Sequence, residues 1–313
     1  MTSARSLLGV LGTVFVPGWP RPLCPSEVRG LARDRFIVVP HWLSARMVSA
    51  LHADALALDS AGLSEQSAVG PSRFGSARLE PSARRSKQCP IFPPPPNHAG
   101  SASMRGELLN AVGKLRAQLQ QQDALGLPEL GAFDTELSYL LYPVGGHYRR
   151  HLDVPRRDHG WLQRGRQASD GGSFSGFSTR RVVSFLIYLN NDWDCEADGG
   201  QLQIFPAISP LSASPETSCA SQLSCAGTRI LASTPEISVQ DQLASTSAQE
   251  QHILSVSPEG GTLVVFFSQE VEHVVCETQR ERQCVVGWFR ETRERRIPDC
   301  DKLSLRTTPP MQP

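Results

Sequence analysis

Three residues with metal-binding side chains, and one arginine after them, are the features of this chain that could perform chemistry. His151-Leu152-Asp153 places a histidine and a carboxylate two positions apart, His273 adds a second imidazole, and Arg282 follows nine residues later. Two histidines and one carboxylate on one face of a metal leave the opposite positions open, which is the ligand set of non-heme Fe(II) oxygenases. A guanidinium binds a carboxylate through two parallel charged hydrogen bonds, so Arg282 suits a dicarboxylate such as 2-oxoglutarate.

The same His-x-Asp spacing occurs once more, at His52-Ala53-Asp54. That copy lies in the stretch 44–58, where apolar residues recur at helical spacing. Side chains two positions apart on a helix do not face each other. We therefore expect His52 and Asp54 to be surface or packing residues and not to share a metal.

His151 and Asp153 are instead expected on an extended segment, after the apolar run 137–142 and a turn at 143–146. Strand residues i and i+2 point to one face about 6 to 7 Å apart, so both can reach one ion. His147 would lie on that face but about 13 Å from His151, and His159 falls in a polar loop, so neither is expected to be a ligand. His273 follows the apolar strand expected at 262–267.

A series of short motifs surrounds these residues in an order and spacing compatible with one domain. The motifs are Tyr142-Pro143, Tyr148, His151-Leu152-Asp153, the run 181–190, Asp192-Trp193, Gly199-Gly200-Gln201-Leu202, Gly260-Gly261-Thr262-Leu263, His273, Arg282 and Trp288-Phe289. Together they resemble the prolyl 4-hydroxylases, more the oxygen-sensing, hypoxia-inducible-factor type and its bacterial relatives than the collagen-modifying branch. The discriminating residue is Arg282, because collagen-type enzymes carry a lysine in that position.

The resemblance implies a mainly β fold with flanking α-helices, a double-stranded β-helix (jelly-roll) barrel. Short apolar runs between Gly, Asn and Pro turns agree with this fold and predict strands at 137–142, 148–154, 181–189, 201–205, 262–267 and 284–290. An amphipathic helix precedes them and, by the resemblance, packs outside the major sheet. Its expected apolar face consists of Leu108, Leu109, Val112, Leu115 and Leu119.

By the same resemblance, His151, Asp153 and His273 are the iron ligands and Arg282 binds the distal carboxylate of 2-oxoglutarate. The implied cofactors are Fe(II), 2-oxoglutarate as co-substrate, O2 and L-ascorbate as reductant, with succinate and CO2 released. Position 286 departs from the family pattern. It holds Val286 where animal oxygen-sensing enzymes have a threonine near the co-substrate, and bacterial relatives also lack that hydroxyl.

Five further residues receive roles from the resemblance. Tyr142 and Tyr188 would offer hydroxyl groups to the co-substrate, and Leu202 would form an apolar wall of its pocket. Trp288 would be the aromatic wall beside the metal, and Arg181 a substrate contact at the mouth. Core packing is the alternative for Tyr188, Leu202 and Trp288, and a salt bridge at a strand start is the alternative for Arg181.

The chain divides into four regions. We expect a targeting or disordered segment at 1–30, an N-terminal helical support region at 31–132, the dioxygenase domain at 133–292 and a tail at 293–313. Within the domain, the Gly- and Ser-rich stretch 164–179 lies where relatives in the resembled family carry a mobile loop, so the resemblance implies a substrate lid there. The Ser-, Ala-, Thr- and Gln-rich stretch 207–257 is expected to be a largely disordered insertion. The proline run 93–96 predicts a rigid linker.

Composition restricts partners and location. The 313 residues carry no net charge and no basic block, so nucleic acid is not an expected partner. Eight cysteines without Cys-x-x-Cys spacing favour free thiols in a reducing compartment. The apolar stretch 7–16 is too short to span a bilayer but could belong to a transit peptide or secretory signal. The cysteine pattern favours cytoplasm or nucleus over an organelle. No contact with a membrane is expected.

The motifs as a whole favour a peptidyl-prolyl 4-hydroxylase that acts on a protein substrate presenting a proline. One alternative is the same chemistry on another residue or on a small molecule. An alternative from a different class is a catalytically silent jelly-roll binding module. The sequence makes no prediction of the oligomeric state.

Overall fold

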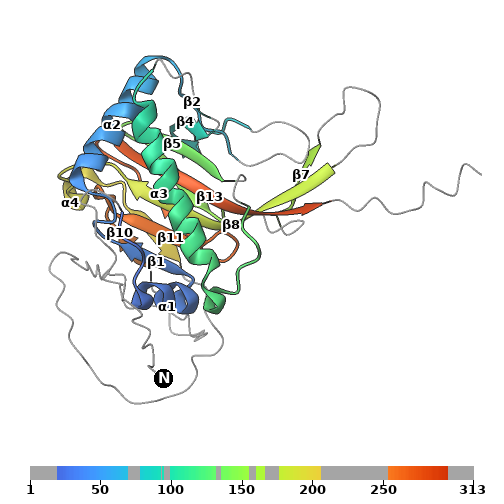
Figure 1. Ribbon diagram of the computed structural model, residues 1–313. Coiled ribbons are helices and arrows are strands. Elements are labelled where there is room, and N and C mark those ends of the chain that lie inside the picture. Colours follow the sequence, from blue (N-terminus) through green and yellow to red (C-terminus); the bar gives the residue numbers. More distant parts are fainter. Residues whose placement is uncertain are drawn as a thin grey trace, which may run out of the picture.

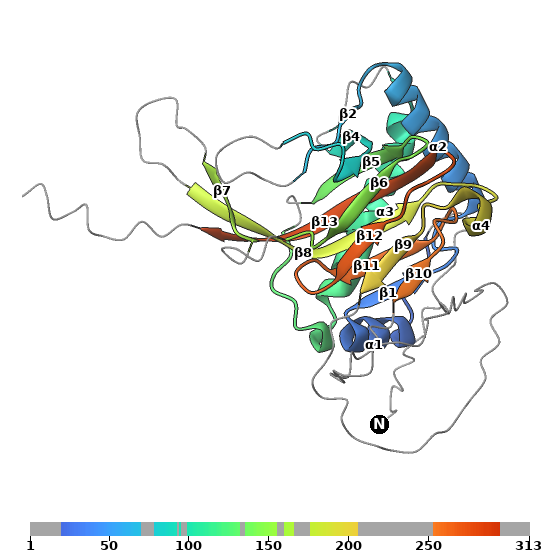
Figure 2. The ribbon, with the colours of Figure 1, turned by 180° about the vertical axis from the view of Figure 1, so that it is seen from behind.

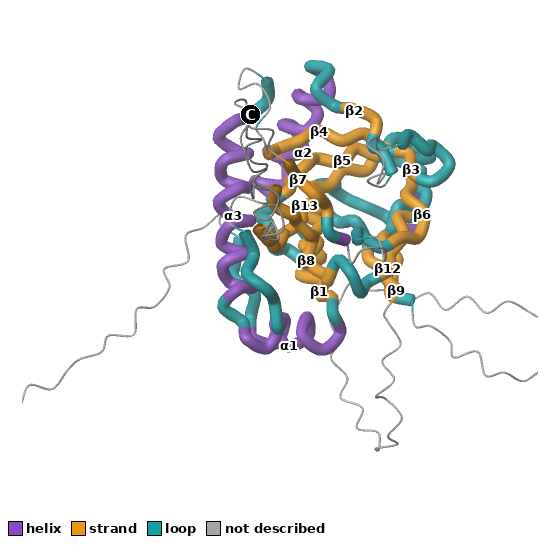
Figure 3. The backbone as a smooth tube through the Cα atoms, turned by 90° about the vertical axis from the view of Figure 1, so that its right-hand side faces the viewer, coloured by secondary structure: helices purple, strands orange, loops and turns teal. Residues whose placement is uncertain are grey.

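The molecule consists of three layers, a set of helices followed by two facing β-sheets (Figures 1 and 3). The computed structural model describes residues 20–69, 78–92, 94, 99–131, 135–154, 160–165, 176–205 and 253–294. Every strand pairing within the two sheets is antiparallel. This arrangement confirms the predicted fold class, a mainly β jelly-roll with flanking helices.

The larger sheet, here called the major sheet, lies in the middle and has eight strands. Its order is β1 (Phe36–Val39), β11 (Leu263–Phe267), β8 (Gly176–Tyr188), β13 (Arg282–Glu294), β5 (Glu136–Tyr142), β4 (Lys87–Phe92) and β2 (Glu65–Gln66), with β7 (Leu162–Gly165) paired to β8. The minor sheet has five strands (Figure 2). Its order is β10 (Leu254–Val256), β9 (Leu202–Phe205), β12 (Glu272–Val275), β6 (His147–His151) and β3 (Arg84–Arg85).

Two long helices cover the outer face of the major sheet (Figure 1). Ser44 caps α2 (Ala45–Ser60) by accepting a hydrogen bond from a backbone N–H of the first turn, and Ser101 does the same for α3 (Ala102–Gln120). The predicted apolar face of α3 is buried apart from Leu109, which is only partly buried. Ala111, which is not in the predicted face, is also buried. The shorter helices are α1 (Pro25–Asp34), the 3-10 turn η1 (Asp123–Leu125) and α4 (Cys195–Asp198).

Side chains alternate along the central strands, so the protein has two apolar cores. On β13, Val285 and Phe289 face the helices, while Cys284 and Val286 face the minor sheet. The ring of Phe185 occupies the space in which a side chain at position 287 would lie. A β-carbon on Gly287 would lie 2.1 Å from that ring. The inner core between the sheets is the one that adjoins the candidate site.

A buried ion pair joins both long helices to the sheet. Arg105 of α3 donates to Asp54 of α2 at 2.7 Å, and the Tyr139 hydroxyl of β5 donates to the other carboxylate oxygen at 2.8 Å. Burial and the nearby carboxylate raise the pKa of Tyr139 above its usual range. His52 contacts the Leu189 carbonyl oxygen through Nδ1 at 3.2 Å. The His-x-Asp copy on α2 is therefore a packing feature, as predicted.

Several predicted boundaries are wrong. The region 31–132 is not only helical, because it contributes β1, β2, β3 and β4 to the two sheets. The insertion expected at 207–257 ends earlier, since β10 pairs with β9. β13 continues to Glu294, inside the predicted tail, and β6 ends at His151 and not at 154.

Other predictions concern residues that lie outside the described ranges. These include His159, most of the segment 1–30, most of the insertion, the tail beyond 294 and all of the proline run except Pro94. The central part of the expected lid, 166–175, also lies there, while its two ends form β7 and the start of β8, which project from the sheet (Figure 2). None of the helices in the described part of the chain has the length and apolarity to span a bilayer. The five cysteines in that part are free thiols.

Candidate active site

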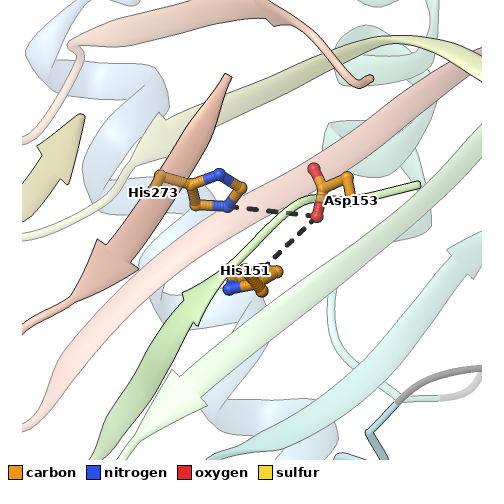
Figure 4. A group of neighbouring side chains, drawn as sticks. All are labelled: His151, Asp153 and His273. Carbon is orange, nitrogen blue, oxygen red and sulfur yellow. Dashed lines mark ion pairs between the residues drawn. The ribbon is translucent and has the colours of Figure 1, made fainter. Parts of the chain in front are cut away.

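His151, Asp153 and His273 converge between the two sheets (Figure 4). His151 ends β6 and His273 lies directly opposite on the neighbouring strand β12. Asp153 follows two residues after the strand end, so the turn of the chain and not strand alternation brings it back toward the histidines. Its Oδ1 lies 3.5 Å from His151 Nε2 and 3.9 Å from His273 Nε2. The potential ligand atoms of all three residues lie within 4.8 Å of one another.

Hydrogen bonds to the backbone orient both imidazoles. His151 Nδ1 donates to the Arg149 carbonyl oxygen at 2.7 Å, and His273 Nδ1 donates to that of Val271 at 3.3 Å. A proton on Nδ1 leaves the lone pair of each Nε2 for a metal. The ring of Tyr148 stacks on His151 with centroids 3.6 Å apart, which restrains this imidazole further.

The electrostatics of the cluster favour the protonation states that bind metal. Burial alone would raise the pKa of Asp153, but its interactions with His151, His273 and Arg181 hold it well below its usual range. Burial, together with the neighbouring His151, lowers the pKa of His273 to about 4. At neutral pH the site therefore presents a carboxylate and a neutral His273 imidazole, which a divalent metal requires of its ligands.

Arg282 is a buried cation at the start of β13. Its Nη1 contacts the Cys284 sulfur at 3.7 Å, while Nε and Nη2 have no hydrogen-bond partner in the described part of the chain. The rings of Tyr142 and Tyr188 lie 4.8 and 5.1 Å from its guanidinium carbon, and the buried Tyr188 hydroxyl likewise has no partner there. A buried charge is normally paired. The unused donors fit a carboxylate ligand, as 2-oxoglutarate binding requires.

A cavity of about 660 Å³ opens onto the three potential metal ligands. All three ligands line it, together with Tyr142, Tyr148, Arg181, Val286 and Trp288. Tyr142 is in contact with the cavity on one side and lies beside Arg282 on the other. Leu202 is fully buried in the inner core and does not line the cavity, which agrees with the packing alternative for this residue.

Arg181 and Trp288 lie together at one wall of the cavity. Arg181 donates to Glu136 Oε2 from Nη2 at 2.7 Å, and its guanidinium carbon lies 3.6 Å from the centre of the Trp288 ring. Arg181 therefore forms a salt bridge and also lines the cavity, while its contact with substrate stays a prediction. Trp288 Nε1 donates to Asp153 Oδ2 at 2.9 Å.

Glu136 and Tyr148 also line the cavity, although the sequence predicts no role for either. Glu136 begins β5 and pairs with Arg181 from β8 and Arg290 from β13. An acidic residue directly before an apolar run was the available signal, but its partners are separated from it by 45 and 154 positions. Only the strand register could connect them.

Comparison with known proteins identifies the class to which this site belongs. Residues 137–290 match the family model described as 2OG-Fe(II) oxygenase superfamily. This part of the chain is a 2OG-Fe(II) oxygenase domain.

Prolyl hydroxylases are among the solved structures with a similar fold. A prolyl-4-hydroxylase from Pseudomonas putida is 28% identical, with a TM-score of 0.54, over 85% of this chain and 98% of that chain. A prolyl hydroxylase from Trichoplax adhaerens, solved with a hypoxia inducible factor peptide fragment, is 18% identical, with a TM-score of 0.56, over 84% and 86% of the two chains. No curated protein matched the sequence. The fold of this chain is therefore similar to that of prolyl hydroxylases.

Proposed function

We propose that this protein is an Fe(II)- and 2-oxoglutarate-dependent dioxygenase that hydroxylates a prolyl residue of a protein substrate. The observation that carries the proposal is the buried Arg282, which has unused donors close to a cavity lined by two histidines and an aspartate. The similarity to the Pseudomonas putida prolyl-4-hydroxylase, which extends over nearly the whole of that chain, supports proline as the target.

In this proposal three side chains bind one face of the Fe(II) ion, those of His151, Asp153 and His273. Arg282 binds the distal carboxylate of 2-oxoglutarate, and the hydroxyl groups of Tyr142 and Tyr188 complete that end of the pocket. The bound metal and co-substrate supply the oxidative chemistry, in which 2-oxoglutarate and O2 become succinate and CO2 while one oxygen atom enters a substrate C–H bond.

The remaining residues of the cavity orient the reactants and limit access of water. Leu186, Val275 and Val286 form an apolar lining. Such a lining strengthens the charge interactions that hold the co-substrate. Arg181 and Trp288, on the wall beside Asp153, would contact the protein substrate, and L-ascorbate would keep the iron reduced.

Succinate formation is the first test. The purified protein is incubated with Fe(II), 2-oxoglutarate, ascorbate and air, beside His273→Ala and the control His147→Ala. His147 lies on the same strand as His151, but its ring nitrogens contact the Gly145 and Ser82 carbonyl oxygens. We expect succinate from the wild type and from His147→Ala but not from His273→Ala.

Mass spectrometry of reacted peptides then separates the alternatives. Oxygen added to proline supports the proposal, whereas oxygen on another residue or on a small molecule assigns the same chemistry to a different substrate. Absence of both metal binding and succinate would favour the catalytically silent binding module.

A further inference from the structure

We infer, building on the proposed function, that Trp288 is a positioning residue whose indole N–H makes Asp153 bind the metal through one oxygen only. The two oxygens of this carboxylate have different surroundings. Oδ1 is the atom close to both histidine Nε2 atoms, at 3.5 and 3.9 Å. Oδ2 instead accepts the hydrogen bond from Trp288 Nε1 at 2.9 Å.

Single-oxygen binding matters because of the number of positions on the metal. Two histidines and one carboxylate oxygen leave three positions of an octahedral ion, which suffice for the two donor atoms of 2-oxoglutarate and for dioxygen. A second oxygen from Asp153 would occupy one of these positions. The indole N–H holds Oδ2 away from the metal and fixes the rotation of the carboxylate, as hydrogen bonds to metal ligands commonly do.

Asp153 needs such support because no strand holds it. The residue lies beyond the end of β6, whereas both histidines sit in paired strands. Arg181 contacts the Asp153 backbone, since its Nη1 donates to the Asp153 carbonyl oxygen at 3.4 Å. The side chain and the backbone of Asp153 are therefore held from the same direction, by Trp288 and by Arg181.

Trp288 is in turn fixed by its neighbours on the major sheet. The Arg181 guanidinium lies over the indole ring at 3.6 Å, a distance typical of a strong cation–π contact. Glu136 accepts hydrogen bonds from Arg181 Nη2 at 2.7 Å and Nε at 3.1 Å, which sets the plane of the guanidinium. We call these three residues, Glu136, Arg181 and Trp288, the Asp153 support. All three line the cavity, so a bound substrate would contact the residues that orient a metal ligand.

The test removes the N–H but keeps the aromatic ring. Trp288→Phe is compared with Trp193→Phe, a matched control in which another half-buried indole donates to a backbone carbonyl oxygen, that of Gly199, at 2.9 Å, and also lies beneath an arginine. Co(II) is titrated into each full-length protein, and its visible absorption spectrum is recorded, which reports coordination number. Thermal unfolding of the metal-free proteins is measured in parallel.

We expect Trp288→Phe to bind Co(II) about 10- to 100-fold more weakly than wild type and to alter the Co(II) spectrum. Trp193→Phe should leave both unchanged, and Arg181→Lys, which keeps the charge but loses the planar stacking, should give a smaller change of the same kind. Wild-type affinity and spectrum in Trp288→Phe would overturn the inference. So would a loss of thermal stability in Trp288→Phe, beyond that of Trp193→Phe, with unchanged Co(II) binding. If the wild type itself fails to bind Co(II), the proposed function is the part that fails.

Discussion

Replacing Arg282 by methionine should have opposite effects on stability and on co-substrate binding. The side chain is fully buried, and two of its nitrogen atoms have no partner in the described residues. Arg282→Met removes the charge and the donors but keeps an unbranched side chain in the same space. The metal-free protein should therefore become more stable, while 2-oxoglutarate should bind much more weakly.

The magnitudes follow from the contacts of Arg282. Each unsatisfied buried donor costs about 1–3 kcal/mol, so removal of two would stabilise the unliganded protein by about 2–6 kcal/mol. Loss of the contacts with the rings of Tyr142 and Tyr188 would offset about 1–2 kcal/mol of this gain. For the co-substrate, loss of one partner of a buried ion pair costs about 3–5 kcal/mol, or at least about 100-fold in Kd.

Two measurements check this prediction. Urea unfolding of the metal-free protein gives the change in stability, and calorimetric titration of 2-oxoglutarate into Mn(II)-loaded protein gives the affinity without turnover. Arg280→Met is the control, because Arg280 is more exposed and already pairs with Asp198. A less stable Arg282→Met protein that keeps wild-type affinity for 2-oxoglutarate would show that this arginine is a structural cation and not a ligand-binding residue.

Three further predictions concern two scaffold positions and one residue of the metal site. Asp54→Asn should lower the free energy of unfolding by about 3–5 kcal/mol in urea titrations, since it leaves the buried Arg105 without its carboxylate; a change below about 1 kcal/mol would contradict this. Gly287→Ala should cost about 1–3 kcal/mol, because its β-carbon would lie 2.1 Å from Phe185; an unchanged Tm would mean that the ring moves freely. The pKa of His273 is about 4 in the folded protein, below its usual value of 6.5. Between these two pH values the unfolded chain binds a proton that the folded chain does not. The stability of the metal-free protein should therefore fall by up to about 3 kcal/mol as pH drops from about 6.5 to about 4, and a His273→Gln variant should not show this loss.

Much of the site could be anticipated from the sequence because its residue types are specific and closely spaced. The spacing of His151 and Asp153, with the later His273, predicted a cluster that the fold does bring together. Strand alternation alone does not explain their proximity. It predicts Asp153 beside His151 on one strand, but the strand ends at His151 and the following bend places the carboxylate. Hydrophobic periodicity gives the type of an element better than its last residue.

Contacts between distant strands could not be predicted. The four-residue strand β1 is apolar enough to be noticed, but nothing in its own sequence indicates that its partner is β11, more than 220 positions later. The same limit applies to Glu136, whose partners lie on β8 and β13. Helix α3 is easier to predict, because its apolar face repeats over about three turns within one segment.

Strand β13 carries residues from each part of the proposed active site. Three of its residues face the same side: Arg282 at its start, Val286, and Trp288 at its middle. At about 3.3 Å per residue, the Cα atoms of Arg282 and Trp288 lie about 20 Å apart. Backbone geometry thus sets the separation between the co-substrate carboxylate and the residue that supports the metal ligand. Inserting or deleting one residue between them would turn one end of the set toward the helices. Changes of substrate in related proteins should therefore arise in the loops and outer strands, while the length of this central strand stays constant.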